Sequence, residues 1–233
     1  TLDVYWNKTS PETSVWKFAC FVSLFPLLLA GPIVRYVELA PQMAAGLLRP
    51  KTVADWESGV MRFSVGLCKK VLIADQIGKV IDPLLSSYQQ LDMVSAWAVM
   101  IGFAYQLYFD FSGYSDMAIG LGRMLGFELP INFDSPSRAV NPSDFWARWH
   151  ITLSRWMRDY LYIPLGGSRG GRLPTLRNLV VTMFLVGLWH GAAWNFVIWG
   201  VVHGVLLVTY HMAKRYWDAI PPLLARGVMF VLI

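Results

Sequence analysis

Residues 178 to 213 read NLVVTMFLVGLWHGAAWNFVIWGVVHGVLLVTYHMA and decide the fold class. These 36 residues contain no Asp, Glu, Lys or Arg. A helix needs about 20 apolar residues to cross a bilayer once, and one helix of this whole length would measure about 54 Å. Arg177 precedes the stretch and Lys214 follows it, and basic flanks favour the cytoplasmic side of a membrane. We therefore expect the stretch to cross the membrane twice, as a tight pair of helices.

The composition of the whole chain points to the same class of protein. Hydrophobic residues make up 55% of the 233 residues and charged residues only 15%, whereas soluble domains carry about 25% charged residues. Three further stretches are strongly apolar: 15–34, 93–109 and 227–233. The net charge is +5, and its basic residues lie in loops beside apolar spans. Membrane topology explains them without a nucleic-acid partner. We predict an all-α, polytopic membrane helical bundle.

The two ends of the sequence suggest that more chain lies beyond them. The first residue is Thr1 rather than Met, and the last residues, VMFVLI, are an apolar run. No basic segment followed by a signal-type core stands near the start. We expect an internal piece of a longer protein, with residues 1–233 forming a single membrane domain that is cut at both ends.

Three other segments carry helical signals. Residues 15–34 predict a membrane helix that Pro26 interrupts. Residues 55–85 mix apolar and charged side chains, which predicts an interfacial helix. Residues 93–109 predict a span that continues to residue 127 through small side chains, which let helices pack closely.

Residues 141–163 predict an amphipathic helix that lies at the membrane interface or re-enters the membrane. Asn141 is the expected N-cap, and Pro142 suits the first helical position. Apolar side chains recur at spacings of four, four, three and four residues, which is one face of a helix. This apolar stripe consists of Phe145, Trp149, Leu153, Trp156 and Tyr160.

His190 lies about 12 residues into the uncharged stretch, or about 18 Å along a helix, which predicts a position near mid-membrane. An ionisable group at that depth is costly and usually faces a cavity, a partner or a pathway. Gly187 and Gly191 allow backbones to approach the ring, and Trp194 and Asn195 are placed to wall a pocket. Position alone leaves open a neutral His190 that only forms hydrogen bonds between helices.

Other polar residues give weaker signals. His150 lies off the apolar stripe and, on its own, fits a plain interfacial histidine. Trp149 and Asp116 are weak candidates for lining a cavity. Asp110 and Asp116 flank a Ser-Gly-Tyr-Ser turn at the end of a span, where capping explains the two acids equally well. The sequence contains no HExxH and no CxxC, so we predict no metal site.

Four motifs in a fixed order resemble the membrane-bound O-acyltransferase family, and most closely its bacterial branch concerned with alginate O-acetylation. The motifs are LFPLLLAGPIVR (24–35), YFDFSGYSDMAIGLGRMLGF (108–127), NPSDFWARWHITLSRWMRDYLYIPLGG (141–167) and GLWHGAAWNFVIWG (187–200). The resemblance extends from about residue 2 to residue 212.

The resemblance implies a multi-helix membrane fold around a central tunnel, with two histidines at the active centre. The membrane-embedded family histidine falls on His190, and the second falls on His150. The enzyme would need no bound cofactor. It would move an acyl group, here acetyl, from a cytoplasmic thioester such as acetyl-CoA toward hydroxyls of an exported polysaccharide such as alginate. The resemblance also implies an extracytoplasmic acetyltransferase partner, polysaccharide synthesis machinery and a multi-pass location in the bacterial inner membrane.

Acyl transfer from a thioester to a hydroxyl needs a base that takes the hydroxyl proton and hydrogen-bond donors that stabilise the oxyanion. We assign the base to His190, while His150 orients the donor or stabilises developing charge. A covalent acyl group on His190 is an alternative. Asn195 and Trp194 are weaker candidates for oxyanion or wall contacts.

Two rival functions stay open. One is a transporter or channel in which His190 relays protons, although the sequence shows no inverted repeats. The other is a non-catalytic scaffold of a polysaccharide-modifying complex.

Overall fold

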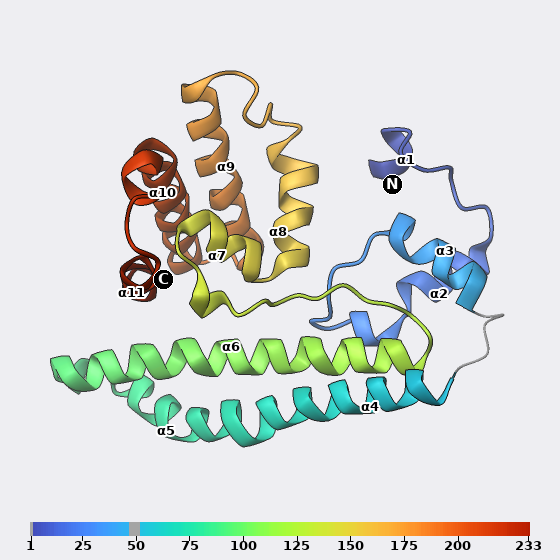
Figure 1. Ribbon diagram of the computed structural model, residues 1–233, viewed down its shortest axis with the longest axis horizontal. Helices are drawn as coiled ribbons and strands as arrows, with labels where there is room; N and C mark the ends of the chain where they lie inside the picture. Colours follow the sequence, from blue (N-terminus) through green and yellow to red (C-terminus); the bar gives the residue numbers. More distant parts are fainter. Residues whose placement is uncertain (1, 47–51) are drawn as a thin grey trace. The chain divides into compact units, whose positions relative to one another are not determined.

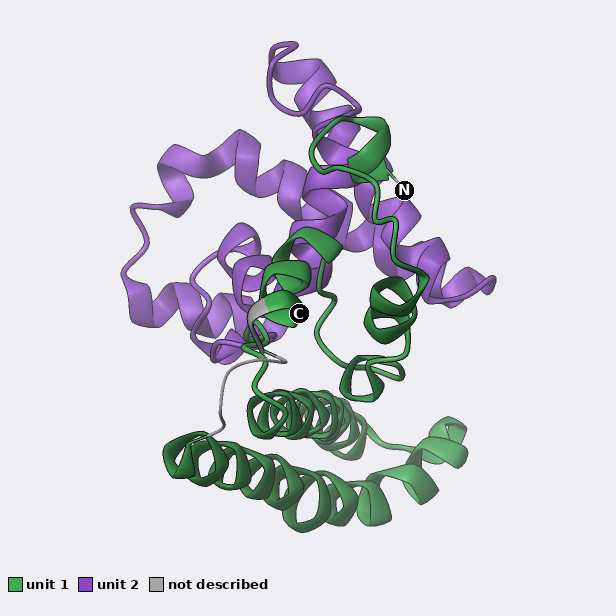
Figure 2. Ribbon diagram, turned by 90° about the vertical axis from the view of Figure 1, so that its right-hand side faces the viewer, with its two compact units in different colours: residues 1–131 green, residues 132–233 purple. Residues whose placement is uncertain are grey.

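The computed structural model describes residues 2–46 and 52–233. Every regular element in these ranges is helical, so the predicted all-α class is confirmed for them. The chain forms two compact units, residues 1–131 and 132–233, which Figure 2 shows in different colours. The single membrane domain expected from the sequence stays a prediction.

The first unit begins with short helices. They are α1 (Leu2–Tyr5), α2 (Val15–Val22), the 3-10 turn η1 (Phe25–Leu27) and α3 (Tyr36–Gly46). The prediction of one helix over residues 15–34 is wrong, because α2 ends after eight residues. Pro26 has no N–H to donate to an α-helical ladder, and it lies instead in the first turn of η1, where that N–H is not needed. The buried core of this unit includes Leu39, Met43, Ile119 and Leu129.

A helical hairpin forms the rest of the first unit (Figure 1). Its first arm consists of α4 (Val53–Cys68), the π-helical segment η2 (Lys69–Ala74) and α5 (Asp75–Ser86), and its second arm is α6 (Met93–Met124). The helices predicted over 55–85 and 93–109 are thereby confirmed as helices, and α6 continues to Met124. The arms meet at two glycine pairs: a Cβ on Gly59 would lie 2.8 Å from the Gly120 carbonyl oxygen, and one on Gly66 would lie 2.5 Å from that of Gly113. Only glycine allows this approach.

Ion pairs join the two arms where the sequence predicts a turn. Cations of the first arm meet acids of the second at nitrogen–oxygen distances of 2.6 to 3.0 Å in the pairs Arg62–Asp116, Lys69–Asp116 and Lys70–Asp110. Lys70 also pairs with Asp75 of its own arm at 2.7 Å. The predicted turn between Asp110 and Asp116 is wrong, because α6 continues through it. The two acids are neutralised by the neighbouring arm and do not cap a helix end.

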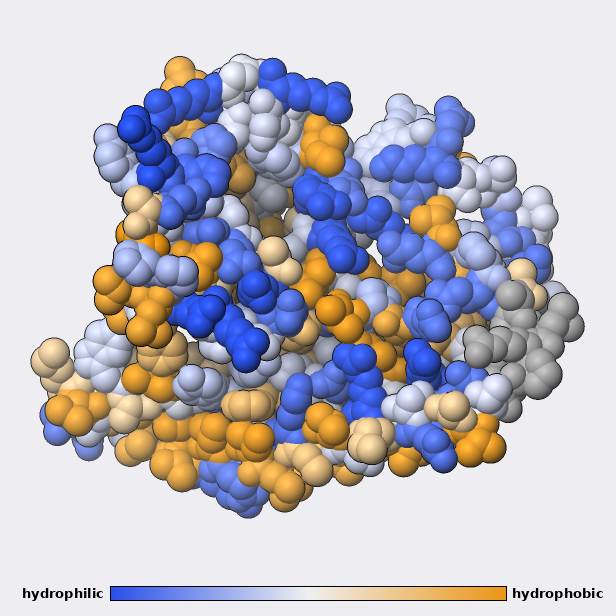
Figure 3. All heavy atoms as spheres, viewed as in Figure 1, coloured by the Kyte–Doolittle hydropathy of each residue, from blue (hydrophilic) through white to orange (hydrophobic). Residues whose placement is uncertain are grey.

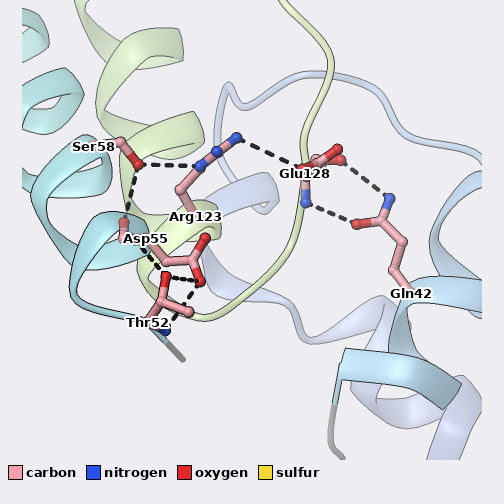
Figure 4. Close-up of polar contacts among 6 residues, drawn as sticks. All are labelled: Gln42, Thr52, Asp55, Ser58, Arg123 and Glu128. Atoms are coloured by element: carbon pink, nitrogen blue, oxygen red, sulfur yellow. Dashed lines mark hydrogen bonds and ion pairs between the residues drawn. The ribbon is translucent and has the colours of Figure 1, made fainter. Parts of the chain in front are cut away.

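Polar contacts fix the chain after α6 against α4 and α3 (Figure 4). Arg123 donates a hydrogen bond to the Ser58 hydroxyl (3.1 Å) and lies 3.7 Å from the Glu128 carboxylate. The side-chain amide of Gln42 in turn exchanges two hydrogen bonds with the backbone of Glu128 (2.7 and 3.1 Å). The end of α6 is therefore held by both neighbouring helices.

The outer face of the arm formed by α4, η2 and α5 is apolar (Figure 3). Its exposed hydrophobic side chains include Trp56, Val60, Met61, Leu72 and Val80. A contiguous apolar face of this kind is rare in water and is typical of surface covered by lipid or by further helices. Among the described residues, one helix, α10 (Trp194–Trp217), is long and apolar enough to cross a membrane.

The second unit carries both candidate histidines. Its elements are η4 (Pro136–Arg138), α7 (Pro142–Arg148), α8 (Ile151–Met157), the π-helical segment η5 (Arg158–Tyr162), α9 (Arg172–His190), α10 and α11 (Pro222–Leu232). The predicted helical pair over residues 178–213 is confirmed as α9 and α10. The two helices pack closely at Gly187 and Gly200, since a Cβ on Gly200 would lie 3.1 Å from the Cα of Gly187.

Candidate active site

The helix that leads to His150 begins as the sequence predicts. Asn141 is the N-cap of α7, and its Oδ1 accepts a hydrogen bond from the backbone N–H of Asp144 (2.8 Å). The Asp144 carboxylate accepts in return from the backbone N–H of Val140 (3.1 Å) and from Arg148 (2.8 Å). Both ends of this short helix are therefore tied to one carboxylate.

The helix stops immediately before His150. Helix α7 ends at Arg148, and α8 begins at Ile151. Between them His150 has φ 42° and ψ 53°, in the left-handed region that side chains other than glycine rarely adopt. The predicted apolar stripe over residues 145–160 is therefore wrong as one continuous helix face. Such a conformation costs about 1–3 kcal/mol, persists only where surrounding contacts hold it, and often marks a functional site.

The chain just before η4 supplies those contacts. The backbone N–H of Ile151 donates to the carbonyl of Asn132 (2.9 Å), and the N–H of Asp134 donates to the carbonyl of Arg148 (3.0 Å). The side-chain oxygen of Asn132 lies 3.1 Å from Nδ1 of His150. Asn132 and His150 are only 1% and 5% exposed. His150 is thus a buried histidine whose backbone and ring are both held by Asn132 and its neighbours.

His190 is the last residue of α9, at the turn into α10, and its side chain is exposed. Three rings surround the imidazole, with centroid distances of 4.9 Å to Trp189, 5.1 Å to Trp199 and 6.1 Å to Phe196. The ring is therefore both oriented by its neighbours and open to a reactant. Its depth in a bilayer stays a prediction.

The two histidines belong to one cluster of rings, called the ring cluster below. Successive members have centroid distances of 4.7 to 6.5 Å and run in the order His190, Trp199, His203, Phe145, Trp149, Phe133 and His150. His150 and His190 stand at the two ends of this series of ring contacts. His203 is buried. The structure therefore brings together the two histidines that lie 40 residues apart in the sequence.

A cavity of about 220 Å³ lies beside the ring cluster, with walls from α7, α8, η5, α9 and α10. One wall is Trp146, whose ring packs against His203 (5.3 Å) and Trp199 (5.8 Å). Within the described part of the chain, Nε1 of Trp146 and Oγ1 of Thr182, another lining residue, are buried without a hydrogen-bond partner. Buried polar groups are almost always paired, so these two are available to an acceptor atom on a ligand.

The weaker candidates from the sequence lie in different places. Trp149 belongs to the ring cluster. Trp194 is 79% exposed at the first position of α10 and Asn195 is also exposed, while the rings against His190 belong to other residues. Asp116 lies in the first unit, where it is bound to Arg62 and Lys69. A lining role for these residues stays a prediction.

Sequence analysis misses Asn132, Trp146 and Trp199. Trp199 has a usable signal, because Phe196, Trp199 and His203 are spaced by three and four residues and so share one face of α10. Asn132 has no such signal, since it lies in irregular chain outside any periodic segment. In residues 2–46 and 52–233, no three His, Cys, Asp or Glu side chains are grouped so as to hold a metal ion.

Comparison with known proteins agrees with this arrangement. Residues 10–225 match the model of the membrane-bound O-acyltransferase family. The chain belongs to this family. The resemblance of the four motifs is thereby confirmed, and the chain is part of a membrane-bound protein.

Several relatives in the family modify polymers. The chain is 44% identical to a peptidoglycan O-acetyltransferase of Helicobacter pylori, over 95% of this chain and 44% of that protein. It is 47% identical to a probable alginate O-acetylase of Pseudomonas aeruginosa, over 88% of this chain and 39% of that protein. A teichoic acid D-alanyltransferase of Bacillus subtilis is 27% identical, over 84% of this chain and 51% of that protein. The chain thus spans about half or less of the length of these relatives.

Proposed function

We propose that the protein containing this chain is a membrane O-acyltransferase that moves an acetyl group from a cytoplasmic thioester toward hydroxyls of an exported polysaccharide. Membership of the family supports the reaction class. The names of the three relatives share one theme, the attachment of an acyl group to a polymer. The observation that carries the proposal is that His150 and His190 belong to one ring cluster.

The chemistry fits these two side chains. As the hydroxyl oxygen bonds to the thioester carbonyl carbon, its proton must leave, and the proton then passes to the thiolate when the carbon–sulfur bond breaks. A neutral imidazole is suited to this task, and general base catalysis contributes about 10²–10⁴-fold in rate. We assign this role to His190, which is open to a reactant. His150 orients the donor or stabilises developing charge, and transient acylation of His190 is the alternative.

The cavity beside the ring cluster offers a place for the acyl group. Its walls are mostly apolar, and the indole N–H of Trp146 and the hydroxyl of Thr182 have no partner within the described residues. A carbonyl oxygen would accept from either group. A dry cavity also strengthens any hydrogen bond to charge that develops on that oxygen.

The thioester and the partners follow from the same proposal. Acetyl-CoA or another acyl thioester is the donor on the cytoplasmic side of the bacterial inner membrane, which the full-length protein crosses several times through helices around a central tunnel. An extracytoplasmic acetyltransferase and the polysaccharide synthesis machinery are the expected partners. The acceptor is alginate or peptidoglycan, since relatives named for each are similarly close to this chain.

Replacement of His190 by Ala in the full-length protein tests the proposal. The measurement is the acetate that mild alkali releases from isolated peptidoglycan and exopolysaccharide of cells expressing each variant at equal membrane levels. We expect His190→Ala to lower acetylation at least about 100-fold if the imidazole is the base. His211→Ala is the matched control, because His211 is an exposed histidine at the other end of α10. Normal acetylation in His190→Ala would reject the enzyme and favour a transporter or a scaffold.

A further inference from the structure

Asn132 is the first residue of the second unit and is almost completely buried. Its side-chain oxygen lies at hydrogen-bond distance from three groups: the backbone N–H of Thr152 (3.2 Å), the hydroxyl of Thr152 (2.9 Å) and Nδ1 of His150 (3.1 Å). Its backbone carbonyl accepts from Ile151. Asn132 thus contacts both the ring of His150 and the backbone that follows it.

The orientation of the Asn132 amide follows from its partners. A backbone N–H can only donate, so the atom that faces Thr152 must be the amide oxygen. A flipped amide would place its NH₂ group against the Thr152 N–H, donor against donor. The oxygen also faces Nδ1 of His150, and an amide oxygen can only accept. Nδ1 must therefore carry a proton, because an unprotonated Nδ1 would place two acceptors 3.1 Å apart.

We propose that Asn132 is a positioning residue that holds His150 in the Nδ1–H tautomer, so that Nε2 is its proton-accepting nitrogen. A neutral imidazole carries one proton, and the partner of one nitrogen decides which nitrogen is the base. The left-handed backbone of His150 fits the same interpretation, because Asn132 contacts both the ring and the next backbone N–H.

The tautomer decides between the two roles left open for His150, which are to orient the donor and to stabilise developing charge. This step rests on the proposed function. A neutral His150 with its proton on Nδ1 cannot donate from Nε2 to an oxyanion, so it acts at Nε2 by accepting a hydrogen bond or a proton. Once Nε2 is protonated, the ring is a cation, and its Nδ1–H remains paired with the Asn132 oxygen. Asn132 therefore favours the charged ring without reaching any reactant.

Nitrogen-15 NMR of the full-length protein, labelled at histidine and reconstituted in lipid nanodiscs, tests the tautomer directly. The His150 signals are assigned by their loss in His150→Ala. We expect wild-type His150 at neutral pH to show a protonated Nδ1 and an unprotonated Nε2. Asn132→Leu removes the acceptor and should mix the tautomers, while Asn132→Asp restores an acceptor and the wild-type pattern. A wild-type ring that carries its proton on Nε2 would overturn the proposal.

Asn178→Leu is the matched control, because Asn178 is also an asparagine that is 1% exposed in the second unit, yet it donates to the backbone of Gly167. It should leave the His150 signals unchanged. If it changes them as Asn132→Leu does, the effect is general loosening of the fold and the proposal fails.

Polymer acetylation, measured in the same variants, distinguishes a failure of this inference from a failure of the proposed function. We expect Asn132→Leu to lower polymer acetylation by about 10- to 100-fold, the loss that follows when the partner that orients a metal-bound imidazole is removed. Asn132→Asp should retain most of it. If the tautomer is as proposed but neither Asn132→Leu nor His190→Ala changes acetylation, the proposed function fails while the tautomer assignment stands.

Discussion

Replacement of Gly200 by Ala tests the close packing of α9 on α10, on which the position of His190 depends. A Cβ at Gly200 would lie 3.1 Å from both the Cα and the N of Gly187, and closer still to the carbonyl oxygen of Met183. All of these are backbone atoms. No change of side-chain rotamer relieves the contact, so the helices must move apart.

Two effects of this substitution oppose each other. Alanine is favoured over glycine inside a helix by about 1 kcal/mol. Overpacking of a close contact costs about 1–3 kcal/mol, and contacts with backbone on the facing helix place this case at the upper end. We expect the free energy of unfolding to fall by about 2 kcal/mol, which is about 30-fold in the folding equilibrium. Separation of the helices should also move Trp199 away from His190 and lower polymer acetylation.

The assay is unfolding in mixed detergent micelles followed by far-UV circular dichroism. Gly227→Ala is the control, because Gly227 is also a helical glycine but has nothing within 4 Å of an added Cβ. That variant should gain up to about 1 kcal/mol. If Gly200→Ala is as stable as Gly227→Ala, the hairpin is not closely packed at this glycine pair and the reasoning is wrong.

Two further predictions concern the first unit. Asp116→Asn should lower the free energy of unfolding by about 2 kcal/mol, because Arg62 and Lys69 lose their shared carboxylate. Asp75→Asn should lower the free energy of unfolding by less, since Lys70 keeps its ion pair with Asp110. Equal thermal unfolding of the two variants would contradict this. The hydrogen bond from Tyr36 to Glu12 lowers the pKa of Glu12 below its usual 4.5 and raises the pKa of Tyr36 from 10.0 to about 12. The wild-type protein should therefore be more stable than Tyr36→Phe between about pH 4.5 and 10. It should lose this advantage as the pH falls through the lowered pKa of Glu12 or rises through the pKa of Tyr36 at about 12. Parallel pH profiles of the melting temperature would show that the hydrogen bond contributes nothing.

Local signals account for the parts of the fold that the sequence predicts well. The Asn141 cap, the long helix from Met93 and the α9–α10 pair each depend on residues within a few turns of one another. A cap needs only a side chain that reaches an N–H three residues on. Trp199 was missed, although its spacing from Phe196 and His203 puts all three on one face of α10.

The errors arise where distant residues decide the local structure. The stripe of apolar residues predicts an unbroken helix through His150, yet the break is stabilised by Asn132, 18 residues earlier in the chain. The turn predicted between Asp110 and Asp116 is absent because cations 40 or more residues away neutralise both acids inside a helix. Periodicity reports on one segment at a time and contains no information on such partners.

The segment η2 has a consequence for how this chain tolerates insertions and deletions. A π-helical turn is usually a single-turn bulge inside an α-helix, so the removal of one residue between Lys69 and Ala74 would restore α-helical winding and rotate everything after it by about 100°. Lys70 would then no longer reach Asp75 and Asp110 together. The number of residues in this segment, more than their identity, sets which side of α5 faces α6.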